Sequence, residues 1–224
     1  MSSMGINTSN PFSRYQCIIF DWDGTVMDSA GKIISCMQIA AKKCNLPIPS
    51  DNDVAHIIGI SLAPAIAQLF AITDNKLVER MVEAYKHAFL AVDTTPCPLF
   101  AGAHELFSQL HPHVTLAVAT GKARRGLARA WDATQTGHFF TDSCCADEAQ
   151  SKPHPEMLEH ILRRQGLTPQ QCLMVGDTTY DLQMAQALGM DRIGVDYGVH
   201  QPHMLHQHEP KAIISAPLEL LKHI

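Results

Sequence analysis

The sequence predicts an α/β fold in which a doubly wound parallel sheet carries an inserted all-helical domain. Two observations predict the sheet: short apolar runs of strand length recur along the chain, and helical patterns lie between them. A third observation predicts the insertion, because the stretch 28–95 offers several helical patterns and no convincing strand. Sites in such sheets lie beyond the carboxyl ends of the strands, so polar residues at those ends are the candidates for function.

The expected strands are apolar throughout, as is typical of parallel strands that helices cover on both faces. They run over 16–20, 114–119, 172–175, 192–195 and 212–214, with a weaker one at 139–144. The helices expected between them run over 104–110, 122–134, 153–165 and 179–188. In the third of these helices we expect Pro153 at the first helical position, where proline is well tolerated.

The insertion is expected to consist of helices alone. One helix covers 29–44, and a second carries an apolar stripe at helical spacing, formed by Leu77, Met81, Tyr85, Ala88 and Val92. The linker pattern D-T-T-P-C-P at 93–98 then returns the chain to the sheet. We therefore expect a core domain made of 1–27 and 96–224, and a cap domain over 28–95.

Part of the insertion also has to be weighed against a membrane span. The stretch 55–72 contains no Asp, Glu, Lys or Arg and approaches the length of about 20 residues that crosses a bilayer. However, Ser61 followed by Pro64 is typical of a new helix start. Two short buried helices are therefore the favoured interpretation.

Composition excludes several classes of protein. Acidic residues number 22 and basic residues 17, giving a net charge of −5, so we expect neither nucleic acid nor a membrane as partner. The 7 cysteines form no C-x-x-C pair and predict neither a zinc knuckle nor a full disulfide framework. Because 1–16 lacks the apolar run of a secretory signal, we expect a cytoplasmic protein, either a monomer or a homodimer.

The first polar cluster, D-W-D-G-T, directly follows the first expected strand. Residues two apart in an extended segment point the same way, so Asp21 and Asp23 can address one site. Gly24 allows the chain to turn sharply after them. Two carboxylates at this spacing suit a nucleophile with a general acid, or a shared metal ion. A solvated turn between strand and helix is the alternative.

A second acidic cluster, G-D-T-T-Y-D, follows the strand at 172–175. Its carboxylates, Asp177 and Asp181, are oxygen ligands suited to a hard cation such as Mg²⁺. Helix capping by Asp177 or Thr178 would explain the same residue types. Two acidic strand ends in one sheet favour the metal site.

Two further strand ends carry groups suited to phosphate. Thr120, Gly121 and Lys122 offer a hydroxyl, backbone N–H groups and an ammonium close to an expected helix start. Lys152 is a cation held at another element boundary. Arg124 and Arg125 follow in the first expected helical turn, where a bound anion or a plain surface cluster would account for them.

Together these segments resemble the four motifs of the haloacid dehalogenase-like superfamily of Asp-nucleophile hydrolases. In order they read F-D-W-D-G-T, A-T-G-K, S-K-P-H-P-E and V-G-D-T-T-Y-D. The helical insertion resembles the C1 cap of that superfamily, and the chain is most similar to its phosphoglycolate phosphatase and pyrophosphatase-like branch. The resemblance covers the chain from about Cys17 to the C-terminus.

The resemblance implies a role for each motif residue. Asp21 is the nucleophile, Asp23 the general acid and base, and Thr120 and Lys152 bind the phosphoryl oxygens. The expected metal is Mg²⁺, held by Asp21, Asp177, a backbone carbonyl of Asp23, and Asp181 directly or through water. Charge counting agrees, because Lys152 alone cannot offset these carboxylates and a phosphate dianion. The expected substrate contacts are Gly24, Thr25, Gly121, Lys122 and His56.

The expected activity is hydrolysis of a small phosphorylated metabolite, with phosphoglycolate first and pyrophosphate second. A dehalogenase is disfavoured because the resembling dehalogenases lack an Asp at the position of Asp23. A sugar phosphomutase is disfavoured because the expected cap loop, 56–62, has no Lys or Arg. A second anionic group on the substrate would then have to meet Lys32, Arg124 or Arg125. A non-catalytic binding protein is disfavoured because every motif residue is intact.

One histidine-rich stretch stays outside these motifs. It comprises His200, His203, His206 and His208, and such spacing can bind Zn²⁺ or Ni²⁺. It lacks accompanying Cys or acidic ligands before Glu209, so we expect a polar loop rather than a native metal site.

Overall fold

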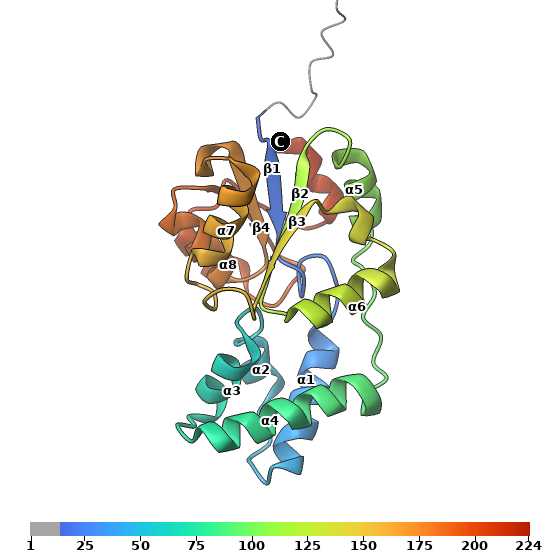
Figure 1. The fold of residues 1–224 in the computed structure, drawn as a ribbon, viewed down its shortest axis with the longest axis vertical. Helices are drawn as coiled ribbons and strands as arrows, with labels where there is room; N and C mark the ends of the chain where they lie inside the picture. Colours follow the sequence, from blue (N-terminus) through green and yellow to red (C-terminus); the bar gives the residue numbers. More distant parts are fainter. Residues whose placement is uncertain (1–13) are drawn as a thin grey trace, which may run out of the picture.

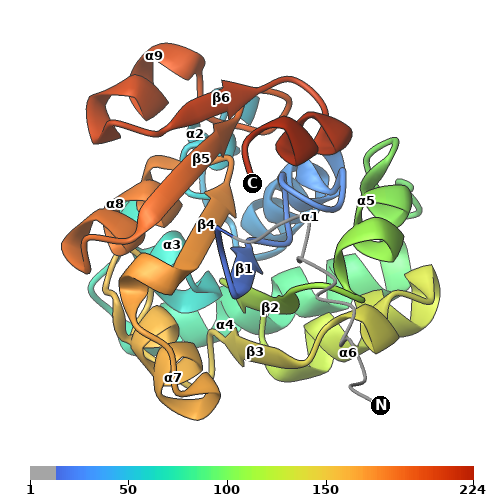
Figure 2. The same cartoon turned by 90° about the horizontal axis from the view of Figure 1, so that it is seen from above.

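The computed structural model describes residues 14–224 and confirms the expected parallel sheet. The sheet has 6 strands in the order β3-β2-β1-β4-β5-β6, with the first strand in the middle (Figure 2). The strands are β1 (Cys17–Phe20), β2 (Thr115–Thr120), β3 (Asp142–Cys145), β4 (Cys172–Gly176), β5 (Asp191–Val195) and β6 (Ala212–Ile214). The segment 1–13, part of the stretch in which no secretory signal is expected, lies outside the described residues.

Helices cover both faces of the sheet, whose central strands β1 and β4 are apolar on both sides. Ile18 and Phe20 of β1 face a cluster that includes residues of α5 (Ala103–Leu110) and α6 (Arg124–Thr134). Cys17 and Ile19 face the opposite way, against α7 (Glu156–Gln165) and α8 (Thr179–Ala187). Figure 2 shows the two pairs of helices on opposite sides of the sheet. The short helix α9 (Pro202–Leu205) follows β5.

Two helices begin later than predicted. Helix α6 begins at Arg124 instead of residue 122, and the Lys122 N–H donates to Thr120 Oγ1 at 3.1 Å. Helix α7 begins at Glu156, so Pro153 is not its first residue. The physical reason is Pro155, because a residue that precedes proline is disfavoured in the helical conformation.

The expected insertion between β1 and β2 is helical throughout its regular elements. It contains α1 (Ala30–Lys43), α2 (Asp51–Ala55), α3 (Leu62–Phe70), α4 (Asn75–His87) and the π-helical turn η1 (Ala88–Val92). These helices share a core of their own, which includes Met37, Ile66 and Met81. Figure 1 shows them gathered beyond the carboxyl ends of the strands, where they form a cap over the sheet.

The stretch 55–72 holds no long helix, but it contains one short helix instead of the two expected. Helix α3 begins after Ser61, as the sequence predicts, whereas α2 ends at Ala55, the first residue of the stretch. Across residues 14–224, no helix is long and apolar enough to span a bilayer.

The cap lies close against the core along one seam. A Cβ atom on Gly121, in the loop after β2, would lie only 2.5 Å from the carbonyl oxygen of Gly59 in the cap. The Ser61 N–H donates to Ser151 Oγ at 2.9 Å, and the Tyr180 hydroxyl donates to the His56 carbonyl at 2.8 Å. The loops that follow the strands therefore face the cap directly.

The seven cysteines, all within the described residues, have free thiols.

Candidate active site

Three carboxylates from two strand ends meet beneath the cap. Asp21 directly follows β1, Asp177 directly follows β4, and Asp181 lies in the first turn of α8. One oxygen of each lies within 4.8 Å of the others, and all three residues are buried. The adjacent, parallel pairing of β1 and β4 brings these residues together from opposite ends of the sequence.

The alternation of an extended chain decides which way the first motif points. Trp22 turns into the core, fully buried, with its ring packed edge-on against Trp131 and Phe140. Asp21 and Asp23 on either side of it therefore point the other way, toward the cap. The aromatic anchor between them fixes the direction of both carboxylates.

Asp177 is held from two sides. Thr25 Oγ1 donates to Asp177 Oδ1 at 2.8 Å, and the Val199 N–H donates to Oδ2 at 2.9 Å. The backbone on both sides approaches so closely that a Cβ on Gly24 or Gly198 would lie 2.2 Å from an Asp177 side-chain atom. The Val199 contact was missed in the sequence, because a backbone N–H leaves no residue-type signal.

Asp181 combines two roles. With Thr178 it forms a capping box at the start of α8: its carboxylate accepts from the Thr178 N–H at 3.1 Å and hydroxyl at 2.7 Å. Its other oxygen, Oδ1, accepts from Lys152 Nζ at 2.6 Å. Helix capping by Thr178 is thus correct. Asp181, its partner in the capping box, also belongs to the carboxylate group.

Lys152 is the cation at the centre of this group. Its ammonium lies 2.8 Å from Asp21 Oδ1 and 2.6 Å from Asp181 Oδ1, and its side chain is fully buried. Burial alone would lower the pKa of Lys152, but the carboxylates of Asp181 and Asp21 outweigh it and raise the pKa. Lys152 is therefore charged at neutral pH.

One ammonium does not balance the charge of three carboxylates, and the pKa values of two of these acids are raised. Burial, with added repulsion from Asp181, raises the pKa of Asp21 well above its usual value despite Lys152. The same two causes raise the pKa of Asp177 to about 7, against the hydrogen bonds from Val199 and Thr25. Like charges gathered out of water resist joint ionisation. The group is short of positive charge.

The donor set fits a hard divalent cation. Both carboxylate oxygens of Asp21 are buried and receive no well-aligned hydrogen bond, although one lies beside Lys152. Carboxylate oxygens in this number are what Mg²⁺ accepts, together with waters and substrate oxygens. An ion here would supply the missing charge and give the Asp21 oxygens a partner.

Asp23 lies beside this group and has partners of its own. The Ser29 hydroxyl donates to Asp23 Oδ1 at 2.6 Å, and Lys122 Nζ lies 3.0 Å from the same oxygen. Thr120 is buried at the end of β2, and its hydroxyl accepts from the Lys122 N–H. Ser29 was missed in the sequence, where it marks only the start of the first cap helix.

The other residues predicted to contact substrate have varied surroundings. The hydroxyl of Thr25 and the backbone of Gly24 lie against Asp177. Gly121 lies against the cap backbone at Gly59. The exposed His56 ring lies 5.3 Å from the ring of His200, on the seam beside α8. Direct substrate contact by these residues stays a prediction.

The histidine-rich stretch does not converge on a metal. His200 is buried and its Nδ1 accepts from the Thr179 N–H at 3.0 Å, whereas His208 contacts Gln183 and Gln186. Within residues 14–224, no set of three close ligand atoms includes these histidines. The expectation of a polar loop is wrong: His203 lies in α9 and His206 begins a 3₁₀ turn over 206–208, both exposed, while His200 is buried.

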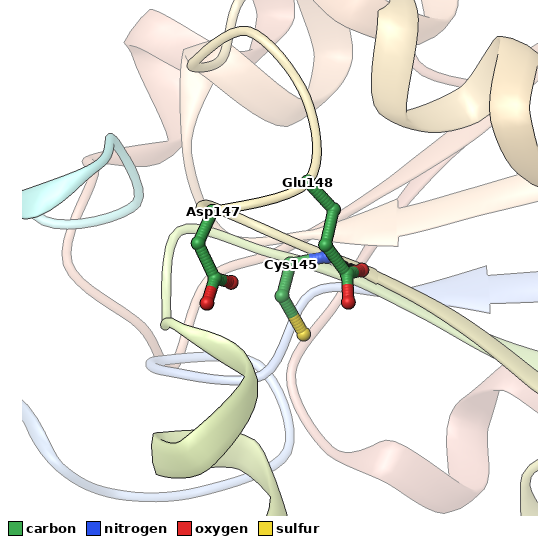
Figure 3. A group of neighbouring side chains, drawn as sticks. All are labelled: Cys145, Asp147 and Glu148. Atoms are coloured by element: carbon green, nitrogen blue, oxygen red, sulfur yellow. Dashed lines mark hydrogen bonds between the residues drawn. The ribbon is translucent and has the colours of Figure 1, made fainter.

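A second group of potential ligands lies after β3 and has a different character. Cys145, Asp147 and Glu148 bring one ligand atom each within 4.8 Å of the others (Figure 3). However, the Arg124 guanidinium donates to both Glu148 oxygens, at 2.7 and 2.6 Å, and its backbone N–H donates to Asp147. Burial raises the pKa of the Cys145 thiol to about 12, which disfavours the thiolate that metals bind.

The comparisons with known proteins agree with this geometry. Residues 18–195 match the family model described as haloacid dehalogenase-like hydrolase. The chain is 32% identical to the probable phosphatase IndB of Dickeya dadantii over 91% of each chain. It is 28% identical to a phosphoglycolate phosphatase of Aliivibrio fischeri, over 90% of this chain and 93% of that one.

A solved structure shows the same fold. A haloacid dehalogenase-like family protein from Streptococcus pneumoniae superposes with a TM-score of 0.83 at 23% identity. The superposition covers 94% of this chain and 99% of the other. The similarity therefore includes the sheet and the inserted helices together.

Proposed function

The chain is a phosphatase of the haloacid dehalogenase-like hydrolase family, and from this premise we propose that it is a Mg²⁺-dependent enzyme acting through an aspartyl-phosphate on Asp21. One observation carries the proposal: three buried carboxylates surround a single ammonium, and the Asp21 oxygens lack well-aligned donors. A charge deficit of this kind is what a metal ion and a phosphoryl group would complement.

In the first step, an Asp21 oxygen attacks phosphorus while the bond from phosphorus to the leaving oxygen breaks. Phosphate monoesters are among the slowest substrates to hydrolyse in water, so splitting the reaction into two steps is useful. Lys152, 2.8 Å from Asp21, stabilises the ionised nucleophile. Asp23 also pairs with a lysine, at 3.0 Å, so the support for Asp21 rather than Asp23 as the attacking group is its place within the buried carboxylate group.

Asp23 would donate its proton to the leaving oxygen in the first step. It would then accept a proton from the water that attacks phosphorus in the aspartyl-phosphate, restoring Asp21 and releasing phosphate. Ser29 and Lys122 both contact Asp23 Oδ1, and this supports a fixed orientation for the carboxyl group. General acid–base catalysis of this type typically contributes about 10²- to 10⁴-fold.

The phosphoryl oxygens would be bound by Thr120, Lys152 and nearby backbone N–H groups. Thr120 and Lys152 are both buried, so their interactions with a charged oxygen act in a medium of low dielectric constant. When bound, Mg²⁺ neutralises charge on the phosphoryl group and on the surrounding acids. The residues proposed to hold it are Asp21, Asp177, the Asp23 carbonyl, and Asp181 directly or through water.

The proposed substrate class is a small phosphorylated metabolite, with phosphoglycolate as the first candidate. The phosphoglycolate phosphatase of A. fischeri, matched over 93% of its length, supports this choice. Pyrophosphate is the second candidate, and phosphoryl transfer to a sugar hydroxyl is the alternative reaction. We propose no nucleic-acid or membrane partner, given the net charge of −5.

The test is phosphate release from a panel of phosphorylated compounds, with and without Mg²⁺. The panel contains phosphoglycolate, pyrophosphate, sugar phosphates and nucleoside monophosphates. We expect turnover that EDTA abolishes, and an acid-stable phosphate label on Asp21 after rapid quenching. Turnover that survives complete removal of divalent metal, or a label on another residue, would contradict the proposal.

A further inference from the structure

Beside Asp23, two ammonium groups from different parts of the chain share one aromatic ring. Lys122 Nζ, from the loop after β2, lies 5.4 Å from the centroid of the Phe89 ring in the cap. Lys32 Nζ, from cap helix α1, lies 4.9 Å from the same centroid. Both distances are in the range of cation–π attraction, which helps to hold two like charges near one place.

Neither ammonium is fully neutralised there. Lys122 pairs with Asp23 at 3.0 Å, and its side chain is only 14% exposed. Lys32 donates to the backbone carbonyl of Asp93 at 3.0 Å, and within the described residues no carboxylate oxygen lies within 4.0 Å of its ammonium. An ammonium has three N–H donors, so each lysine retains donors for a ligand.

Two further groups, one in the cap and one in the linker that follows it, border the same space and are polar only at their tips. Burial raises the pKa of Tyr85 well above its usual value, and the nearby charge of Asp23 adds to this effect. Burial also raises the pKa of Cys97, which senses the charges of Lys32, Asp23 and Lys122. Both side chains are therefore neutral at physiological pH, so the two lysines dominate the electrostatics.

We propose that Lys32, Lys122 and Phe89 form a leaving-group subsite that selects small phosphate esters or anhydrides whose leaving group carries its own negative charge. The proposal rests on the proposed function, because it takes Asp23 as the acid that faces the leaving oxygen. A carboxylate and a second phosphate are the two chemical sources of that charge.

Arg124, one of the alternative cations named from the sequence, does not compete for this role. Arg124 is occupied by Glu148 and by the Ser143 hydroxyl and carbonyl on the β3 edge. The cap loop 56–62 contributes contacts to Ser151 and Tyr180 at the seam. Lys32 is thus the candidate whose charge lies in the same space as Asp23 and Lys122.

The test compares kcat/KM for substrates that differ in leaving-group charge. Phosphoglycolate has a carboxylate, pyrophosphate a second phosphate, glycerol phosphate no charge, and phosphoethanolamine an ammonium. We expect Lys32→Met to lower the ratio of kcat/KM for phosphoglycolate to that for glycerol phosphate roughly 10- to 100-fold, mainly through KM. Lys32→Arg should recover most of the ratio, because it keeps the charge.

The matched control is Lys43→Met, which removes the same charge from the exposed far end of the same helix. It should leave the ratio within about 2-fold of the wild type, because surface charges at that distance are screened. An equal fall of the ratio in Lys43→Met and Lys32→Met would overturn the subsite and indicate a general charge effect. Comparing phosphoglycolate with pyrophosphate in the wild type distinguishes the two sources of charge.

A measurement on the unmodified enzyme keeps the inference testable if Lys32→Met does not fold. Glycolate should inhibit phosphoglycolate turnover at a concentration roughly 10-fold or more below that needed for the neutral diol ethylene glycol. Equal inhibition by the two would overturn the subsite. Absence of Mg²⁺-dependent turnover for every panel compound would instead overturn the proposed function.

Discussion

Two groups of potential metal ligands in this molecule meet the same distance criterion and differ in every other respect. The group formed by Asp21, Asp177 and Asp181 is buried, and its single cation is Lys152. The group after β3 includes the exposed Glu148, both of whose oxygens accept from Arg124. The pKa of Asp177 rises to about 7, whereas the Arg124 hydrogen bonds lower the pKa of Glu148.

The difference teaches that proximity of acidic side chains does not define a metal site. In the β3 group, a bidentate guanidinium already occupies the lone pairs that a metal would use. In the group beneath the cap, one compact ammonium leaves the Asp21 oxygens without aligned donors. The direction of the pKa shift reports this distinction, since unbalanced burial raises the pKa of an acid and pairing lowers it.

The largest difference in activity should appear when one acid of each group is replaced in turn. Asp21→Asn should lower kcat on the order of 10⁴-fold or more, because the amide is a poor nucleophile and the mechanism has no substitute. The isosteric Glu148→Gln should retain kcat within about 2-fold. Both are measured by phosphate release under saturating Mg²⁺, with circular dichroism to check the fold. Comparable losses of kcat in the two variants would contradict the proposed difference between the two groups.

Metal binding should stabilise the protein through one group only. At a free Mg²⁺ concentration 100-fold above Kd, we expect the free energy of unfolding to rise by about 2.7 kcal/mol. Asp177→Asn should abolish most of this gain, and Asp147→Asn should leave it intact. Urea unfolding with and without Mg²⁺ measures the gain in stability. Loss of this gain in Asp147→Asn would show that the ion binds to the group after β3 instead.

In the metal-free protein, the two groups should change the free energy of unfolding in opposite directions as the pH rises. Folded Asp177 holds a proton up to about pH 7 that the unfolded chain releases near pH 3.8. The free energy of unfolding should therefore fall as pH rises from about 4 to about 7, by up to a few kcal/mol. Asp177→Asn should flatten this slope, as equilibrium unfolding in EDTA across that range can determine.

Glu148 should act in the other direction. Because its folded pKa lies below the usual value of 4.5, its contribution is present above about pH 4.5 and is lost on further acidification. Urea unfolding between pH 3 and 5 should thus give a smaller acid-induced loss of stability in Glu148→Gln than in the wild type. An acid-induced loss identical in the two proteins would show that the pairing has no energetic effect.

The smallest effect should come from the surface ion pair itself. Arg124 and Glu148 retain 38% and 35% side-chain exposure, so solvent screens their attraction. We expect the double-mutant cycle of Arg124→Met and Glu148→Gln to give a coupling energy of about 1 kcal/mol or less. A coupling several times larger would mean that the β3 edge depends on this pair.

The sequence predicts most of the sheet because the apolar run that marks a buried strand is a local signal. The central parallel strands are buried on both faces and therefore appear as apolar runs, as Cys17–Phe20 does, whereas β3 contains Asp142 and Ser143 and gives a weaker signal. The direction of Asp21 and Asp23 follows from the two-residue repeat of an extended chain, and the fully buried Trp22 between them agrees. Helix starts are less predictable, as Glu156 illustrates, because several prolines compete to set them.

Other parts of the candidate site arise from contacts that have no sequence signature. The Val199 N–H reaches Asp177 from a loop 22 residues away, and any residue other than proline could supply it. Phe89 and Tyr85 lie on a helix whose apolar pattern indicates only a buried stripe. The proximity of Phe89 to Lys122 exists only once the cap is folded onto the core.

The central position of β1 has a consequence for the timing of synthesis. The first strand leaves the ribosome early, yet one of its two neighbours, β4, is made about 150 residues later. At about 5–20 residues per second, the apolar segment Cys17–Phe20 waits roughly 8–30 s for that partner. The cap helices, which have their own core, can assemble during this interval. A nascent chain should therefore carry a folded cap before Asp21 and Asp177 meet, and so acquire activity only after β4 has been made.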